Sequence, residues 1–209
     1  MPEHYKGMYT VPQILTNRSE EFIFCAQKLE EEFGYQEVNL NLGCPSKTVV
    51  SRYRGSGFLI KTDDLERFLD EIFEALDMRI SVKTRIGKWD EEEFDELLRI
   101  YNRFPMEELI VHPRLQQDYY KNTPNLEAFE KATEESANRL CYNGDIFTVE
   151  DYAKWKERFP RTEMLMMGRG ILRNPGLIGM IKGKGAPEKE RIHEFHDRLL
   201  KEYIEVNSG

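Results

Sequence analysis

The chain has 209 residues, a length that suits one domain, or one domain with a piece of a second. Its hydrophobic fraction of 40% is enough for a packed core, and its apolar runs are too short to predict a membrane span or a signal peptide. The formal net charge of −8 speaks mildly against a nucleic-acid binder. Basic residues nevertheless follow the predicted strands, so a locally positive rim on an acidic protein remains an alternative. Three widely spaced cysteines without a CxxC motif favour a reducing cytoplasm and predict neither disulfides nor a zinc site.

Short β-rich runs alternate with amphipathic helical runs along the chain. We expect strands over residues 9–15, 37–41, 80–85, 108–112, 139–142 and 163–167. We expect helices over residues 19–33, 63–76, 91–104, 125–136, 148–159 and 188–206. Ser19, Thr62 and Thr148 precede acidic residues and are the predicted N-caps of three of these helices. Repeated βα units predict parallel strands with the helices packed outside them.

Polar, potentially reactive residues follow the predicted strands. One rim that carries the chemistry above apolar strands is the layout of a (β/α)8 TIM barrel. Only six strands can be counted, so the expected fold is an incomplete barrel of about six βα units over residues 1–182. For residues 183–209 we expect a linker rich in Lys, Gly and Pro, followed by one helix that is the start of a second, helical domain.

Two glycine motifs end the last two predicted strands, Asn143-Gly144-Asp145-Ile146 and Met167-Gly168-Arg169-Gly170. Glycines let backbone N–H groups approach an anion, and Arg169 adds positive charge. Either motif alone is equally an ordinary turn. Together, one unit apart, they favour a site for a cofactor phosphate at the late loops of a barrel.

Lys83 and Arg85 lie two residues apart and therefore on the same side of their strand. A buried ammonium needs a partner, and either the oxygens of a flavin or an internal carboxylate would supply one. A third interpretation is that Lys83 forms a Schiff base with a substrate. His112 and Arg114 offer a neutral imidazole and an anion-binding guanidinium on the next strand. A lone histidine at a strand end is more often satisfied by the backbone, so both readings stay open.

Cys44 is the thiol displayed most prominently, between Gly43 and Pro45 at the end of the run Asn39-Leu-Asn-Leu-Gly-Cys-Pro-Ser46. The glycine and the proline predict a sharp, fixed bend at the end of a strand. A free thiol is mostly protonated at neutral pH and can act as a proton donor or, with a base, as a nucleophile. Spacing does not choose between these chemistries. Cys25 and Cys141 are expected to be apolar core residues.

Taken together, these motifs resemble the tRNA-dihydrouridine synthases. The resemblance rests on Asn39 to Lys47, Gly55-Ser-Gly57, Val82 to Arg85, Val111 to Arg114 with Gln117 and Tyr119, and the two glycine motifs, and it covers about residues 9–182. It implies an FMN-dependent reductase that converts uridine in tRNA to 5,6-dihydrouridine with NADPH or NADH. Hydride would pass from reduced FMN to uracil C6.

The resemblance also implies a role for each matching residue. Cys44 matches the catalytic cysteine that protonates C5, and Asn41 matches a position that holds the flavin and the target base. The cofactor-binding positions are matched by Gln13, Lys83, His112, Asn143, Gly144, Asp145, Gly168 and Arg169. Arg85 and Arg114 are expected to face the substrate.

The chain departs from the family pattern in three places. The family's first strand, with a Met-Ala-Pro-Met-like stretch, and its second strand are not found in this sequence. A single helix corresponds to the family's C-terminal tRNA-binding domain. Lys121 stands where family members often have a glycine after the tyrosine. An incomplete barrel exposes apolar faces and free edges, so we expect weak FMN binding and self-association through the open edge.

Two alternative functions remain: a related FMN barrel that acts on a free pyrimidine such as dihydroorotate, and a non-catalytic fragment.

Overall fold

The computed structural model describes residues 7–207. The chain divides into two compact units, which are described separately. The first consists of Met1–Gly144 and Phe159–Met166, and the second of Asp145–Arg158 and Met167–Gly209. Within residues 7–207, no helix combines the length and the hydrophobicity needed to cross a lipid bilayer.

The first unit is built on one parallel sheet whose strands pair in chain order. Among the described residues the strands are β1 (Gln13–Ile14), β2 (Glu37–Leu42), β3 (Arg79–Gly87), β4 (Leu109–Leu115), β5 (Leu140–Tyr142) and β6 (Met164–Leu165). Each strand is hydrogen-bonded in parallel to the next one along the chain. This order confirms the predicted α/β fold with six parallel strands, as in part of a TIM barrel.

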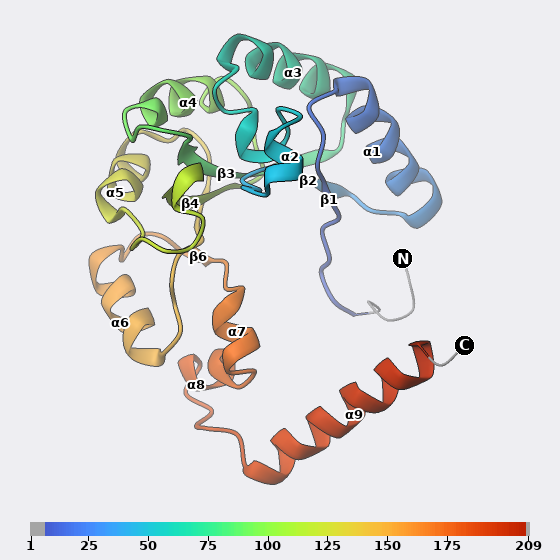
Figure 1. The fold of residues 1–209 in the computed structure, drawn as a ribbon, viewed down its shortest axis with the longest axis vertical. Helices are drawn as coiled ribbons and strands as arrows, with labels where there is room; N and C mark the ends of the chain where they lie inside the picture. The colour runs from blue at the N-terminus through green and yellow to red at the C-terminus, as the bar shows by residue number, and fades with distance from the viewer. Residues whose placement is uncertain (1–6, 208–209) are drawn as a thin grey trace. The chain divides into compact units, whose positions relative to one another are not determined.

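Helices connect these strands and cover the outer side of the sheet (Figure 1). The covering helices are α1 (Ser19–Phe33), α3 (Thr62–Ala75), α4 (Glu93–Tyr101) and α5 (Leu126–Glu135). The short helix α2 (Lys47–Val50) and the 3-10 turn η2 (Gly55–Gly57) lie in the connection after β2, and the 3-10 turn η3 (Gln116–Asp118) follows β4. In α3, Leu65, Phe68, Leu69 and Ile72 recur at helical spacing and are buried. Phe68 contacts the ring edges of Phe22 in α1 and Phe58 after η2, which joins the helices into one apolar layer.

The two faces of the sheet differ in chemistry because side chains alternate along a strand. Leu40, Val82 and Leu109 are in register on one face and are fully buried. On the opposite face, Asn41 is in register with Lys83, and Lys83 with Ile110. Near the carboxyl ends of β2 and β3 this second face carries the polar side chains of Asn41 and Lys83. The exposure of apolar surface expected of an open barrel stays a prediction.

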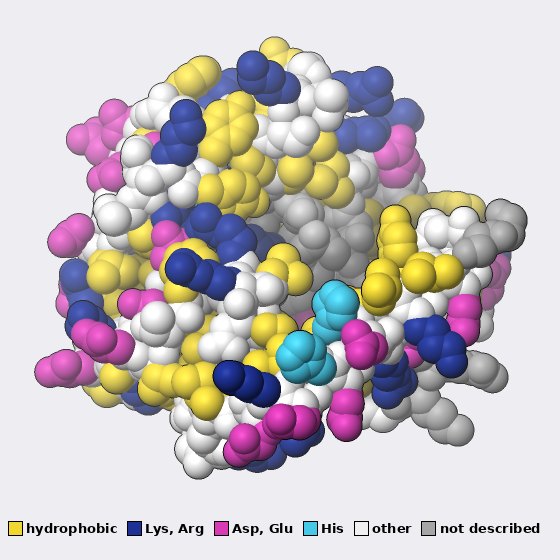
Figure 2. All heavy atoms as spheres, turned by 60° about the horizontal axis from the view of Figure 1, so that its bottom comes forward, with side chains coloured by type: hydrophobic (Ala, Val, Ile, Leu, Met, Phe, Trp, Pro, Cys, Tyr) yellow, Lys and Arg dark blue, Asp and Glu magenta, His cyan; other side chains and the backbone are white. Residues whose placement is uncertain are grey.

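The second unit contains α6 (Val149–Arg158), α7 (Arg169–Arg173), α8 (Leu177–Ile181) and α9 (Lys189–Asn207). The predicted cap of α6 is correct, since Thr148 Oγ1 accepts from the Asp151 N–H at 3.0 Å and Asp151 accepts from the Thr148 N–H at 2.9 Å. No residue of α9 is buried, and Figure 2 shows hydrophobic side chains between charged ones on the helix that carries the cyan histidines.

Three expectations about local structure are wrong. Ser19 and Thr62 are the first helical residues rather than N-caps, and neither helix has a side-chain cap. Ser19 instead donates its hydroxyl to Glu71. Cys25 is exposed on α1, because the buried positions of this helix are Ser19, Phe22 and Ala26. Cys141 is buried, as expected.

Candidate active site at the carboxyl ends of the strands

The turn that presents Cys44 is held by the side chain of Asn41. Asn41 lies near the end of β2, and its Oδ1 accepts hydrogen bonds from the backbone N–H groups of Gly43 and Cys44, both at 3.0 Å. This side chain satisfies donors that would otherwise be left open where the strand ends. Asn41 therefore fixes the start of the turn and the half-buried position of Cys44.

The far side of the turn is closed by Gly55 and Ser56. The carbonyl oxygen of Cys44 accepts from the Ser56 N–H at 3.1 Å and from the Ser56 hydroxyl at 2.9 Å. Gly55 has a φ of 54°, and a Cβ there would lie 2.7 Å from the Cys44 carbonyl oxygen. Gly43, in contrast, is outside the left-handed region and has ordinary space for a Cβ. The glycine that the turn requires is thus Gly55, eleven residues after Cys44, and not the neighbouring Gly43.

A chain of amide side chains runs from β1 to β3 beside this turn. Gln13 accepts from Asn41 Nδ2 at 2.7 Å and donates to Asn39 Oδ1 at 2.7 Å. Asn39 in turn donates to the hydroxyl of Ser81 at 2.9 Å. Gln13 and Asn41, both predicted from the sequence as site residues, are therefore in direct contact. Asn39 belongs to the motif that carries the resemblance but was not predicted as a site residue, and Ser81 carried no signal beyond strand alternation.

Lys83 is mostly buried on the same face as Asn41 and forms no ion pair with a carboxylate of the described residues. Burial, and then the positive charge of Arg85, lower the pKa of Lys83 to about 8. The ammonium form still predominates at neutral pH. A mostly buried cation of this kind needs a partner, and a ligand rich in hydrogen-bond acceptors would supply one.

Arg85 joins two segments of the rim through three backbone carbonyls. Its guanidinium, 2% exposed, donates to the carbonyl oxygens of Gly43 at 2.9 Å, Leu115 at 2.7 Å and Tyr119 at 2.7 Å. The group also lies over the ring of Tyr120, 5.5 Å from its centroid. Arg85 thus connects the Cys44 turn to the loop after β4.

His112 and Arg114 lie on β4 beside Arg85. Arg114 is 1% exposed, donates to the Asn122 carbonyl oxygen at 2.6 Å and approaches His112 Nε2 at 3.3 Å. A guanidinium can only donate, so this nitrogen of His112 acts as the acceptor. Burial, followed by the charges of Arg85, Lys83 and Arg114, lowers the pKa of His112 to about 3, which keeps the imidazole neutral. The substrate role expected for Arg85 and Arg114 stays a prediction.

Asn143 and Gly144 follow β5. Asn143 links β4 to the residue that follows β6, donating its N–H to the Val111 carbonyl and its side-chain amide to the Met166 carbonyl, both at 2.9 Å. A Cβ on Gly144 would overlap the phenol of Tyr142, 1.9 Å from its oxygen. Gly144 is therefore required for packing against Tyr142.

The second unit contains the remaining predicted residues. Asp145 and Arg169 form an ion pair, and the Arg169 guanidinium lies over the ring of Phe147, 5.4 Å from its centroid. Gly168 caps the short helix α7, and a Cβ at this position would meet no atom within 4 Å. A Cβ on Gly170 would lie 2.1 Å from the Ile146 carbonyl oxygen, so this glycine serves close packing.

The first unit therefore gathers Gln13, Asn41, Cys44, Lys83, Arg85, His112 and Arg114 at one end of its sheet. The carboxyl ends of parallel strands are where α/β-barrel enzymes place their chemistry, so this end of the sheet is the candidate active site. Ser56, whose two hydrogen bonds hold the Cys44 carbonyl, entered the sequence reasoning only through the Gly-Ser-Gly motif. No cluster of three or more histidine, cysteine or acidic side chains suited to a metal occurs in residues 7–207.

The chain belongs to the dihydrouridine synthase (Dus) family, whose model matches residues 2–208. It is 25% identical over 194 residues to a probable tRNA-dihydrouridine synthase of Rhizobium leguminosarum bv. phaseoli, covering 90% of this chain and 61% of that protein. It is 30% identical over 189 residues to a probable tRNA-dihydrouridine synthase of Rickettsia prowazekii, with coverages of 85% and 56%. A tRNA-dihydrouridine(16) synthase of Pseudomonas syringae pv. tomato is 29% identical over 153 residues, with coverages of 72% and 48%. The chain thus spans about half to three fifths of the length of these relatives.

Proposed function

We propose that this chain carries the reaction site of an FMN-dependent reductase that converts uridine in tRNA to 5,6-dihydrouridine. The observation that carries the proposal is the set of hydrogen bonds that fixes the backbone on both sides of the Cys44 thiol. Asn41 accepts from the N–H groups of Gly43 and Cys44, and Ser56 donates to the Cys44 carbonyl oxygen. A cysteine with a purely structural role needs no such set of hydrogen bonds. Membership of the Dus family supplies the class of reaction.

The residues fit FMN on two observations. Lys83 is a mostly buried ammonium with no carboxylate partner in the described structure, which suits the oxygens of a flavin ring. The backbone of Gly168 has open space where a Cβ would stand, at the start of a helix whose first residue is a cation. We assign Gln13, Lys83 and His112 to the ring, and Asn143, Gly144, Asp145, Gly168 and Arg169 to the ribityl and phosphate end.

When bound, FMN supplies the hydride that uracil accepts at C6, and NADPH or NADH is the proposed source of electrons. Cys44 donates the proton that C5 accepts, so that the C5–C6 double bond becomes a single bond. Asn41 orients this thiol through the backbone and presents its amide to the base. His112 stays neutral at physiological pH and offers hydrogen bonds without adding a charge next to Lys83.

Arg85 and Arg114 are proposed to act at the substrate side of the rim. Arg85 fixes the Cys44 turn relative to the loop that carries Tyr119 and Tyr120, so it shapes the entrance for the base. A uridine inside the folded tRNA must leave its stack to reach Cys44, as in other enzymes that modify a base.

A Cys44→Ala variant tests the proposal. We expect the variant to retain flavin, seen in its absorbance, and to lose most of the dihydrouridine formed in an unmodified tRNA transcript, with Cys44→Ser as the matched control for size. Unchanged turnover would remove Cys44 as the proton donor. Oxidation of the reduced flavin by orotate but not by tRNA would favour the free-pyrimidine alternative. Protein that takes up no flavin on titration would favour the non-catalytic reading.

Self-association through the free edges of β1 and β6 is the remaining proposal about partners. Within the described residues, each of these strands pairs on one side only. Sedimentation velocity over a range of protein concentrations measures it, and a single monomeric species throughout would exclude it.

A further inference from the structure

The loop between β3 and α4 presents an exposed tryptophan on a sharply bent backbone. The register of β3 with β4 shifts between Arg85 and Gly87, which marks a β-bulge at the end of the strand. Gly87 has a φ of 152°, and a Cβ there would lie 2.7 Å from the carbonyl oxygen of Asp90, so this turn requires glycine. The chain therefore leaves the sheet at a tight turn, and the side chain of Trp89 in this loop is 59% exposed.

Hydrogen bonds fix the backbone of Trp89 on both sides. The carboxylate of Glu93 accepts from three consecutive backbone N–H groups, those of Lys88 at 2.7 Å, Trp89 at 2.9 Å and Asp90 at 3.0 Å. The Trp89 carbonyl oxygen accepts from the side-chain amide of Gln117 at 3.1 Å. A single exposed apolar side chain needs no explanation by itself. A ring on a backbone that is fixed before any ligand arrives, however, gives up less conformational freedom on binding.

The same hydrogen bonds connect Trp89 to the rim that carries Cys44. Gln117, which holds the Trp89 carbonyl, lies in the loop after β4, two residues before Tyr119. Arg85 donates to the Tyr119 carbonyl at 2.7 Å and to the carbonyl of the residue before Cys44 at 2.9 Å. Trp89 is therefore on a loop that is tied, through its neighbour, to the turn of the candidate active site.

Positive charge and further aromatic surface accompany this ring. The ammonium of Lys88 lies over the indole, 4.6 Å from its centroid. The neighbouring loop after β4 adds Tyr120, which is 53% exposed, and the exposed side chain of Lys121. Exposed aromatic rings together with cations are the combination by which proteins hold unpaired nucleotides.

The loop also carries carboxylates, and these decide which part of a nucleotide it can take. Glu93 accepts the backbone N–H groups described above, and Asp90 Oδ1 accepts from the Glu92 N–H at 2.9 Å. Their negative charge disfavours a phosphate placed directly on this loop. Stacking on the indole of Trp89 needs no charge, so a base fits the loop better than a phosphate does.

We propose that Trp89 is a stacking platform for the base of one unpaired nucleotide that flanks the target uridine of the RNA. Every base has a π face, so this contact adds affinity without selecting a sequence. Lys121 on the neighbouring loop supplies positive charge for the backbone of the same strand. The inference rests on the proposed function, because the RNA that carries the target uridine is the one that reaches this rim.

Intrinsic fluorescence of the full chain tests the platform directly. The chain has two tryptophans, and the other one, Trp155, is 5% exposed. A base stacked on Trp89 should quench its emission, so titration with an unmodified tRNA transcript should quench the wild type and leave Trp89→Ala unquenched. Fluorescence anisotropy of labelled tRNA should show a loss of affinity of roughly 5- to 150-fold in Trp89→Ala. Trp89→Phe retains an aromatic face and should lose less.

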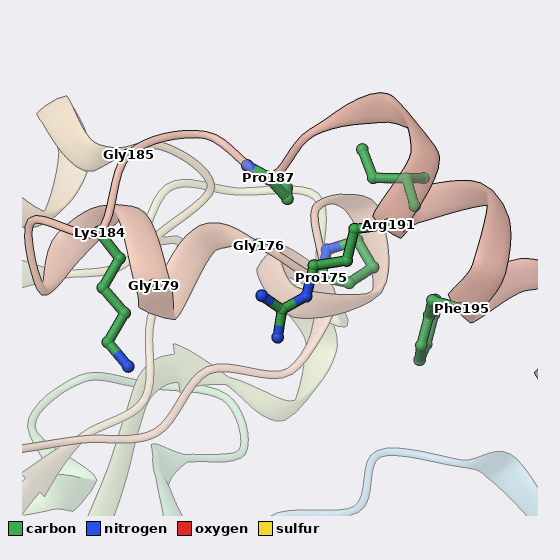
Figure 3. Close-up of a pocket in the computed structure, with 9 residues that line it drawn as sticks. Pro175, Gly176, Gly179, Lys184, Gly185, Pro187, Arg191 and Phe195 are labelled. Atoms are coloured by element: carbon green, nitrogen blue, oxygen red, sulfur yellow. The ribbon is translucent and has the colours of Figure 1, made fainter.

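The matched control is Phe24→Ala, because Phe24 is an aromatic residue of α1 that is 62% exposed. This control should bind tRNA with wild-type affinity. The second unit has a pocket of about 380 Å³, whose lining includes Lys184, Arg191 and Phe195 (Figure 3). No residue of the β3–α4 loop lines that pocket, so variants of Trp89 leave its walls unchanged.

Wild-type affinity in a Trp89→Ala variant with a wild-type melting curve would overturn the inference, as would an equal loss in Phe24→Ala. Quenching of Trp89 by NADP⁺ but not by tRNA would assign the ring to the dinucleotide and overturn it as well. Because no readout uses flavin or turnover, quenching by tRNA without uridine reduction would support the platform and remove only the proposed function. Uridine reduction without any quenching of Trp89 would remove only the platform.

Discussion

Replacing Gly55 with alanine should disturb the Cys44 turn, whereas replacing Gly43 should not. At Gly55 an alanine would have to adopt a φ near 54°, which costs roughly 1 to 2 kcal/mol for a residue with a Cβ. The new Cβ would also lie 2.7 Å from the Cys44 carbonyl oxygen and 3.0 Å from Cys44 Cβ. Overpacking of this kind costs about 1 to 3 kcal/mol, so the sum is about 2 to 5 kcal/mol.

Gly43→Ala is the matched control, because its Cβ would meet nothing closer than 3.6 Å and its φ is not left-handed. Urea denaturation followed by circular dichroism measures the free energy of unfolding of both variants. A Cys25→Ser background removes the exposed thiol, so that the rate of modification by a disulfide reagent reports on Cys44. We expect Gly55→Ala to increase this rate and Gly43→Ala to leave it unchanged. Equal destabilisation by the two substitutions would refute the reasoning.

Three further outcomes are expected. In the folded state the pKa of Lys83 is about 8, below its ordinary value of 10.5. The charged side chain therefore destabilises the folded state, with its full effect below pH 8, and this effect disappears as the pH rises toward 10.5. Lys83→Met should therefore be more stable than the wild type at pH 7, by up to about 3 kcal/mol, with a difference that shrinks by pH 10 in urea titrations; a constant difference would contradict this. Tyr101→Phe removes a buried hydrogen bond of 2.9 Å to Thr84 and should cost about 1 kcal/mol of unfolding free energy, and no loss in denaturant midpoint would show that the bond contributes nothing. Alkylation followed by mass spectrometry should label Cys25 first, Cys44 more slowly and Cys141 only after unfolding, and early labelling of Cys141 would contradict its burial.

The elements that the sequence predicts best are those with long periodic patterns. The α1 prediction matches the observed helix at both ends, because Phe22 and Ala26 set the period and Gly34, with a φ of 72°, ends the helix. The helices α2, α7 and α8 have only four or five residues each, too few for a hydrophobic period, and were not predicted. Predicted strands were longer than observed at the two edges of the sheet, where β1 and β6 have two residues each.

The site was predictable as a set of residues and less so as a set of contacts. Cys44, Asn41 and Gln13 were identified from motifs, and the structure joins them by hydrogen bonds. That Arg85 would hold three carbonyl oxygens could not be predicted, since those carbonyls lie at positions 43, 115 and 119 and only the fold brings them together. Glycine roles were hard to predict for a related reason: backbone conformation decides them, and a glycine next to the reactive residue is not necessarily the one under steric constraint.

Strand pairing in strict chain order has a consequence for how the first unit is made. Within residues 7–207, each strand from β2 to β6 pairs with the strand of the βα unit immediately before it, so each new contact closes a loop of only one unit. As the chain leaves the ribosome, its sheet can grow by one strand at a time, without waiting for a distant segment. Among the described strands, the edge that receives the next strand is always the one most recently synthesised.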